Sequence, residues 1–296
     1  MTRVAVAQLS LQVARAAGNR AAAEAAVEEA AAAGARVVVL PELVNSGYVF
    51  SGAGEAEALA EPADGPTVTG WARLARAHDL VIVGGFCERV DGGVSNSQAL
   101  VDPAGIREVY RKVHLWDDEQ DVFVPGERAA PVVDTAVGRI GMMVCYDLEF
   151  PEWVRACALA GADLLAVSTN WPSAPVPIGE RPVLVAYAQV AAAGNRMFVA
   201  VADRCGAERG VSWVSGTSII GPDGYPLAGP VLQDRPAVLV ADCDLTRAWD
   251  KSTGSRNDVH RDRRPHLYGG GDGSTPGVET NPAAEPVIKP VARPAV

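Results

Sequence analysis

Short apolar runs recur along the chain, and stretches with helical periodicity separate them. In the first half we predict strands at Val4–Gln8, Val37–Leu40 and Leu80–Phe86, because each run is short, apolar and bounded by helical or turn residues. Asn19 is expected to cap the first helix and Gly34 to end it. Strands that alternate with helices in this way restrict the chain to an α/β fold.

The second half repeats this arrangement. Its helices are predicted at Pro151–Ala160 and Glu180–Gly194, and its turn Gly221-Pro-Asp-Gly224 echoes the earlier Asp102-Pro-Ala-Gly105. The remaining strands are expected at Ser95–Val101, Ile106–Arg111, Val132–Thr135, Arg139–Val144, Asp163–Ser168, Met197–Ala202, Ser215–Ile220 and Ala237–Cys243. Two similar halves predict two mixed sheets packed face to face, with helices outside and a pseudo-twofold axis between the halves.

The composition changes near the C-terminus. Pro, Gly and polar residues dominate from Ser252 onward. We therefore predict one domain over residues 1–251 and a Pro/Gly-rich tail over residues 252–296. The tail is expected to be either an extended arm on a partner or disordered.

Cys145 stands where a predicted strand gives way to a predicted helix. Ile140 to Val144 form the strand, and Pro151 and Glu152 favour the first helical turn. A nucleophile at such a turn stands clear of the sheet, next to backbone N–H groups that can hold an oxyanion. The alternative is a buried structural cysteine. We give that interpretation to the other four cysteines, Cys87, Cys157, Cys205 and Cys243.

Two charged residues also follow predicted strands. Glu42 comes after Val37–Leu40, and Lys112 comes after Ile106–Arg111. Residues beyond the carboxyl ends of strands line the ligand crevice of α/β sheets, so these two could meet Cys145. The three would then supply a base, an oxyanion stabiliser and a nucleophile. Each charge also has a simpler interpretation, as a surface carboxylate or a solvated lysine.

Three motifs together resemble the nitrilase superfamily, the carbon–nitrogen hydrolases. Pro41-Glu42, Arg111-Lys112-x-His114-Leu115 and Cys145-Tyr-Asp-x-x-Phe150-Pro151-Glu152 stand in the order and at the separations of that family. The resemblance runs from about residue 3 to residue 245. It implies the same fold as the two-halves pattern, a four-layer αββα sandwich.

The resemblance also implies a role for each motif residue. Glu42 would be the general base, Lys112 would steady the tetrahedral intermediate, and Cys145 would form a thioester acyl-enzyme. A second glutamate follows the lysine in this family, and Glu119 matches it, because the residues from Glu119 to Gly126 resemble the family's Glu, aromatic residue, then Pro-Gly. From the residues alone, Glu119 ends an acidic run that would usually be a solvated surface.

Four residues are expected to contact the substrate. Tyr48 lies near the start of a long loop over residues 45–66, and loops of that length are usually functional. Tyr146 would offer its amide N–H to the oxyanion. Asn170 and Trp171 follow a predicted strand, close to where the acyl group should lie. Trp171 would form a compact apolar wall there, or alternatively would only pack its loop.

The substrate is predicted to be a small aliphatic amide. Tyr146-Asp147 follows the cysteine where nitrilases of the family usually show Trp-Glu, and no arginine lies in residues 169–172 to hold a substrate carboxylate. We therefore expect hydrolysis to a carboxylic acid and ammonia. One alternative is an N-carbamoyl amide hydrolase that acts on a carbamoyl amino acid or polyamine. Another is a non-catalytic interaction module on the same scaffold.

The composition limits which other classes of partner and cofactor are expected. The formal net charge of −10 argues against nucleic acid and anionic membranes. No apolar run approaches a membrane span, no signal peptide is evident, and five cysteines suit a reducing compartment, so a cytoplasmic location is expected. The four histidines are scattered, and no phosphate-binding glycine motif occurs, so neither a metal nor a cofactor is predicted.

A homodimer or larger homo-oligomer is also predicted. The helix at Pro151–Ala160 carries Trp153, Val154, Cys157 and Leu159, which cover more of its circumference than one core contact needs. The resemblance implies that helices of this region pair across a twofold axis.

Overall fold

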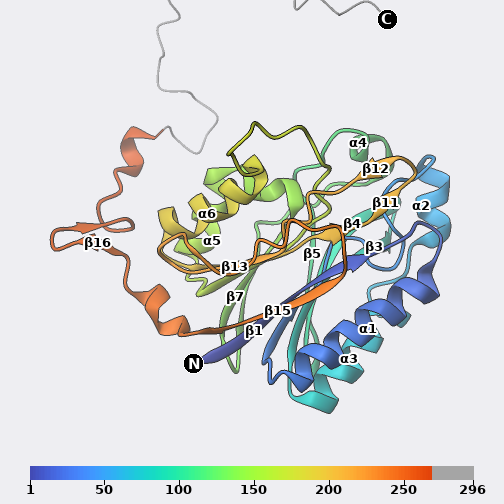
Figure 1. Ribbon diagram of the computed structural model, residues 1–296, viewed down its shortest axis with the longest axis horizontal. Coiled ribbons are helices and arrows are strands. Elements are labelled where there is room, and N and C mark those ends of the chain that lie inside the picture. Colours follow the sequence, from blue (N-terminus) through green and yellow to red (C-terminus); the bar gives the residue numbers. More distant parts are fainter. Residues whose placement is uncertain (269–296) are drawn as a thin grey trace, which may run out of the picture. The chain divides into compact units, whose positions relative to one another are not determined.

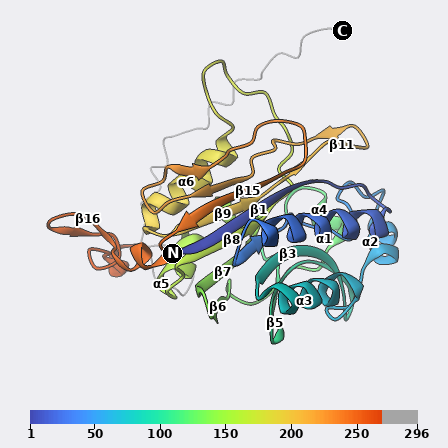
Figure 2. The same ribbon diagram turned by 60° about the horizontal axis from the view of Figure 1, so that its bottom comes forward.

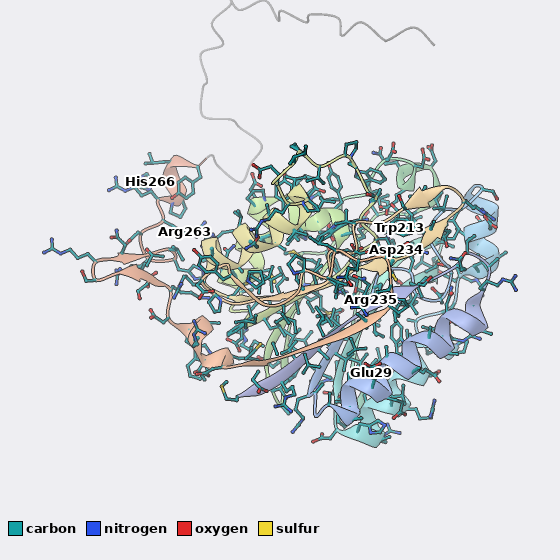
Figure 3. All side chains as sticks on the ribbon, viewed as in Figure 1. Glu29, Trp213, Asp234, Arg235, Arg263 and His266 are labelled. Atoms are coloured by element: carbon teal, nitrogen blue, oxygen red, sulfur yellow. The ribbon has the colours of Figure 1, made fainter. Side chains whose placement is uncertain are left out.

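The structure is a computed structural model that describes residues 1–268. One compact unit spans Met1–His260, and a second begins at Arg261. The described part of the second unit contains a single 3₁₀ turn, η3, at Pro265–Leu267, with the Arg263 guanidinium over the Tyr268 ring (Figure 3). The rest of the predicted tail, residues 269–296, lies outside the described residues.

Seven strands form the first sheet. β1, β2 and β3 run parallel at its centre, while β4, β5 and β15 pair antiparallel with their neighbours, and β15 lies beside β1 in Figure 1. The bounds are Thr2–Ser10 (β1), Val37–Val39 (β2), Val81–Val90 (β3), Gly93–Asp102 (β4), Gly105–Arg111 (β5), Arg204–Cys205 (β10) and Ala237–Cys243 (β15).

Six strands form the second sheet, with parallel β7, β8 and β9 at its centre. The bounds are Val132–Thr135 (β6), Gly138–Val144 (β7), Leu164–Ser168 (β8), Phe198–Ala202 (β9), Ser218–Ile220 (β13) and Pro226–Ala228 (β14). Two small hairpins stand apart from both sheets: Ala207–Glu208 (β11) with Val211–Ser212 (β12), and Ser252–Gly254 (β16) with Asn257–Asp258 (β17).

The two sheets pack face to face, as predicted. Apolar side chains of both sheets, such as Val83 and Val144, share one core cluster. Polar contacts also cross the interface: Gln98 Nε2 donates to Ser168 Oγ at 2.9 Å, and Ser168 Oγ donates to the Leu40 carbonyl at 2.8 Å. These bonds tie the carboxyl ends of β2 and β8 together, and so they fix the edge at which the site is built.

Helices cover both outer faces (Figures 1 and 2). α1 (Ala16–Ala32) and α3 (Pro66–His78) pack on the first sheet, and α5 (Pro151–Leu159) and α6 (Val183–Asn195) pack on the second. The chain is therefore an αββα sandwich, as expected from the sequence. None of the helices in residues 1–268 combines the length and apolar character that crossing a membrane requires.

Several local predictions were wrong. Asn19 lies inside α1, after an N-cap at Arg15, and its side chain instead holds the backbone N–H and carbonyl of Gln12. The presumed loop over residues 45–66 contains a short helix, α2, at Ala53–Leu59. α6 begins at Val183 rather than Glu180, because proline at 182 disfavours helical geometry in the residue before it.

Candidate active site

Glu42 lies in the tight turn after β2 and is fully buried. Its Oε1 accepts hydrogen bonds from Asn96 Nδ2 at 2.6 Å and Lys112 Nζ at 3.0 Å, whereas its Oε2 has no partner. The turn can sit against β3 only because residue 85 is glycine, since a Cβ there would come within 2.5 Å of the Glu42 Cα. One carboxylate oxygen of Glu42 is thus held, and the other is left available.

Lys112 follows β5 and is also fully buried. Its Nζ bonds to Glu42 Oε1 and, at 2.8 Å, to Glu119 Oε1. Burial opposes a charge on this ammonium, but the adjacent Glu119 and Glu42 raise the pKa of Lys112 well above its usual value. Lys112 therefore carries a fixed positive charge at the centre of the site.

Glu119 opens α4 (Glu119–Val122) and is 4% exposed. Besides Lys112, it accepts from the Tyr48 hydroxyl at 2.9 Å and from the Trp116 backbone N–H at 2.9 Å. Burial raises the pKa of Glu42 to about 7, Lys112 opposes that rise, and the neighbouring Glu119 adds to it. Two carboxyl groups thus share one ammonium, and the pKa of Glu42 lies near neutrality.

Cys145 follows the last residue of β7 and starts a 3₁₀ turn, η1, at Cys145–Glu149. Its φ is +48°, a left-handed conformation that costs a non-glycine residue about 1–2 kcal/mol. Burial raises the pKa of the Cys145 thiol well above its usual value; Glu42 raises it further, while Lys112 and the backbone N–H of Asn170 lower it. The thiol is therefore neutral at rest and needs a neighbouring base to become a nucleophile.

Asp147 is a buried residue that links the Cys145 turn to the Lys112 segment. Its Oδ2 accepts from the Tyr110 hydroxyl at 2.8 Å and from the Val144 N–H at 3.2 Å. Its Oδ1 lies 2.7 Å from His114 Nδ1. The sequence reasoning used Asp147 and His114 only as parts of motifs. Asp147 and His114 are polar residues that lie close in sequence to Cys145 and Lys112, and this was the signal that could have predicted the contact between them.

Asn96 was missed altogether. It lies on β4, and its side chain donates to Glu42 and, at 3.4 Å, to Glu119. A lone asparagine in a strand carries no motif, so the sequence offered no signal for it.

The four residues expected at the substrate occupy different surroundings. Tyr48 is bonded to Glu119, and Asn170 Nδ2 donates to the Glu42 carbonyl at 3.1 Å, so both adjoin the cluster. Tyr146 is half-buried, with its ring edge-on to Phe150. Trp171 is 2% exposed and packs in the core of the second sheet, where a Cβ on residue 216 would lie 2.8 Å from its ring.

A cavity of about 220 Å³ opens beside Glu119. Its walls are mainly apolar and aromatic, with two further carboxylates. They are formed by Tyr48, Val49, Phe50, Trp116, Asp117, Asp118, Glu119, Val122, Phe123, Pro172 and Val211. The indole at this cavity belongs to Trp116, and Trp171 is not among these residues. Within residues 1–268, no cluster of three or more His, Cys, Asp or Glu could hold a metal ion.

Comparisons with known proteins agree with this geometry. A family model described as carbon-nitrogen hydrolase matches residues 3–251. A nitrilase from Pyrococcus abyssi is 34% identical over 271 residues, which cover 90% of this chain and 99% of the relative. An N-carbamoylputrescine amidase from Arabidopsis thaliana is 35% identical over 270 residues, covering 84% and 88%.

A solved structure is also similar. It is a variant of the amidase from Nesterenkonia sp. AN1 that shows Michael addition of acrylamide at its active-site cysteine. The two chains superpose with a TM-score of 0.72 at 27% identity, over 90% of this chain and 98% of the other.

Proposed function

Because the chain belongs to the carbon–nitrogen hydrolase family and is an enzyme of the amidase type, we propose that it hydrolyses small aliphatic amides to a carboxylic acid and ammonia. The observation that carries this proposal is the enclosed group of Cys145, Glu42, Lys112 and Glu119, in which one oxygen of Glu42 has no partner.

Acylation uses the available oxygen of Glu42. As the Cys145 sulfur attacks the amide carbonyl carbon, the thiol proton passes to Glu42. Lys112 and the Tyr146 N–H stabilise the oxyanion that forms, and each such contact typically lowers the barrier by about 3 kcal/mol. The C–N bond then breaks, Glu42 returns the proton to the leaving ammonia, and a thioester remains on Cys145.

Deacylation runs through the same base. Glu42 takes a proton from a water molecule that attacks the thioester carbon, and the proton then returns to the sulfur as the carboxylic acid leaves. A base that both accepts and donates in one cycle works best with a pKa near the working pH, and the pKa of about 7 for Glu42 supports this role.

Glu119 is assigned a positioning role. Its oxygens are already occupied by Lys112, the Tyr48 hydroxyl and the Trp116 N–H. A carboxylate with those partners braces the lysine and is poorly placed to carry a second proton.

N-carbamoyl amide hydrolysis is the second candidate function. The Arabidopsis relative is an N-carbamoylputrescine amidase, and the same four residues could release ammonia and carbon dioxide from a carbamoyl group. The two candidates differ in whether carbon dioxide is formed.

The enzyme is also proposed to be a cytoplasmic homodimer or larger assembly. All five cysteines are unpaired thiols, which suits a reducing compartment. α5 and α6 contact each other and leave apolar side chains exposed, namely Leu159, Val183, Tyr187 and Val190. The α6 members recur at helical spacing and so form one face that a second copy could cover. Light scattering that gives a mass of 30.8 kDa at micromolar concentration would contradict this.

The test of the main proposal is ammonia release from a panel of short amides, carbamoyl amino acids, carbamoyl polyamines and nitriles. We expect amides of propionamide or butyramide size to be turned over, and Cys145→Ala to release no ammonia from them. Carbon dioxide release with carbamoyl substrates, and none from simple amides, would favour the second candidate instead. Turnover by Cys145→Ala at the wild-type rate would overturn both.

A further inference from the structure

The outer part of the cavity beside Glu119 has a chemical character that the catalytic steps do not require. Four aromatic residues line it together with Asp117 and Asp118, namely Tyr48, Phe50, Trp116 and Phe123. Trp116 is 37% exposed, and both aspartates are exposed, so they lie at the solvent side, while Glu119 is buried at the other side. A substrate that reaches the catalytic group through this cavity must pass both aspartates.

The charges around this cavity are unbalanced. Among the described residues that line it, none is Lys or Arg. Arg209 donates to the Val49 carbonyl but is held by Glu55 at 2.6 and 2.7 Å. Lys112 is held by Glu42 and Glu119. Within residues 1–268, neither Asp117 nor Asp118 forms an ion pair, so their charges face the cavity uncompensated.

Aromatic faces beside carboxylates attract an organic ammonium group. Cations bind favourably over Trp and Tyr rings, and carboxylates add a Coulomb attraction that is moderate at an exposed site. The cavity also adjoins the buried catalytic group, because its lining residue Glu119 shares Lys112 with Glu42. The acidic run therefore lines this cavity and is not an isolated patch of surface.

We propose that this cavity selects aliphatic amides or carbamoyl amides that carry an ammonium group at the end remote from the scissile bond. Asp117 and Asp118 are the specificity-determining residues, and the same charges reject substrates that end in a carboxylate. This inference rests on the proposed function for the reaction and adds the substrate class.

The test compares three amides with the same three-methylene spacer and a different terminal group: 4-aminobutanamide (ammonium), pentanamide (methyl) and glutaric acid monoamide (carboxylate), with longer homologues of each. We expect wild-type kcat/KM to favour the cationic amide over pentanamide by about tenfold, and the anionic amide to be the poorest. Asp117→Asn/Asp118→Asn should reduce the cationic-to-neutral ratio to about one. Raising the salt concentration from about 0.02 to about 0.5 M should reduce the wild-type ratio as well.

Asp121→Asn is the matched control, because Asp121 is an exposed acid of the same segment that does not line the cavity. It should leave the wild-type ratio unchanged. An equal ratio in wild type and in the double variant, or a wild-type preference for pentanamide, would overturn the inference. A loss of preference in Asp121→Asn equal to the loss in the double variant would also overturn the inference.

A binding measurement separates the inference from the proposed function. Calorimetry on Cys145→Ala measures the affinity for the three amides without turnover. If wild type hydrolyses none of them but this variant still binds the cationic amide about tenfold more tightly, the proposed reaction fails and the inference stands. If amides are hydrolysed but bound without regard to charge, the proposed reaction stands and the inference fails.

Discussion

Two of the groups of buried charged side chains in residues 1–268 are built differently. In the catalytic group, Glu42 and Glu119 share the single ammonium of Lys112. In the second group, which we call the Arg204 clip, Arg204 and Glu208 pair one to one with N–O distances of 3.2 Å. The first has two carboxyl groups for one ammonium, and the second has one carboxylate for one guanidinium.

The carboxylates of the two groups also differ in their hydrogen-bond partners. Glu208 Oε2 also accepts from the backbone N–H groups of Tyr48 and Val49, at 2.9 and 2.7 Å. The Arg204 guanidinium lies 4.3 Å from the ring centre of Trp213, which Figure 3 labels. Both carboxylate oxygens of Glu208 are bonded, whereas Glu42 Oε2 is not. A balanced pair holds backbone in place, and an unbalanced group keeps one carboxylate able to exchange a proton.

The largest expected effect comes from breaking the catalytic group. Glu42→Gln or Lys112→Ala should lower kcat/KM by at least about 10³-fold, and Cys145→Ala by more, because each removes an interaction made in the transition state. Glu42→Gln should also fail to accumulate a thioester in intact-mass measurements with amide. Cys157→Ala, a buried cysteine outside the group, is the control and should stay active. Wild-type rates in Lys112→Ala would show that the ammonium is only structural.

Breaking the Arg204 clip should instead cost stability. Arg204→Met leaves Glu208 buried without its cation, which typically costs about 3–5 kcal/mol in the free energy of unfolding. Arg204→Met/Glu208→Gln should recover part of that loss, because the uncompensated charge is gone. Urea unfolding measures both. If the single variant is as stable as wild type, the Arg204 clip does not stabilise the fold.

The sequence predicted the catalytic group much better than the Arg204 clip. Glu42, Lys112 and Cys145 each follow a strand within a motif, so their meeting beyond the carboxyl ends of strands from the two sheets could be expected from the sequence. Arg204 and Glu208 are four residues apart, but the chain between them forms β10 and β11 rather than a helix. Their pairing with Tyr48 depends on contacts between segments more than 150 residues apart, which no local pattern encodes.

The substrate side was the least predictable part of the site. Trp171 comes three residues after the end of β8, and its position predicted a wall of the acyl pocket; its ring is buried and packs against residue 216, so this remains a prediction. Trp116 lies in a segment without helical or strand periodicity, so neither its direction nor its exposure could be read from the sequence. The end of a strand predicts where the backbone lies, but the packing around each residue determines the direction of its side chain.

A smaller effect is expected from pH, and it should distinguish the catalytic group from the Arg204 clip. Burial raises the folded pKa of Glu42 to about 7 from an ordinary value near 4.5. The folded state therefore binds a proton more tightly than the unfolded state, so this group's contribution to stability is full at low pH and is lost as pH rises through about 7. Relative to wild type, Glu42→Gln should gain up to about 3 kcal/mol in the free energy of unfolding between pH 5 and pH 8.

The activity should move in the opposite direction over the same range. Glu42 must be ionised to take the thiol proton, so wild-type kcat/KM for amides should rise as pH passes through about 7. Stability of Glu42→Gln that follows wild type at every pH would contradict the raised pKa. A flat rate profile from pH 5 to pH 8 would contradict the base role.

The smallest expected effect concerns Tyr48, which belongs to both groups. Its backbone N–H is held by Glu208, and its hydroxyl donates to Glu119 at 2.9 Å. Burial and the neighbouring Glu119 raise the pKa of Tyr48 well above its usual value, so the hydroxyl keeps its proton and remains a donor. Tyr48→Phe keeps the backbone contact and loses only that donor, which should cost about 1–2 kcal/mol in transition-state stabilisation, or about 5- to 30-fold in kcat/KM.

A double-mutant cycle with Glu119→Gln tests whether this bond acts through the carboxylate. If the hydroxyl works by holding Glu119 against Lys112, removing both groups should cost less than the sum of the two single losses. The loss in Tyr48→Phe should also appear in kcat rather than KM, because the bond braces a group that acts in the transition state. Additive losses, or a change confined to KM, would mean that the Tyr48 hydroxyl acts on the substrate directly and not through Glu119.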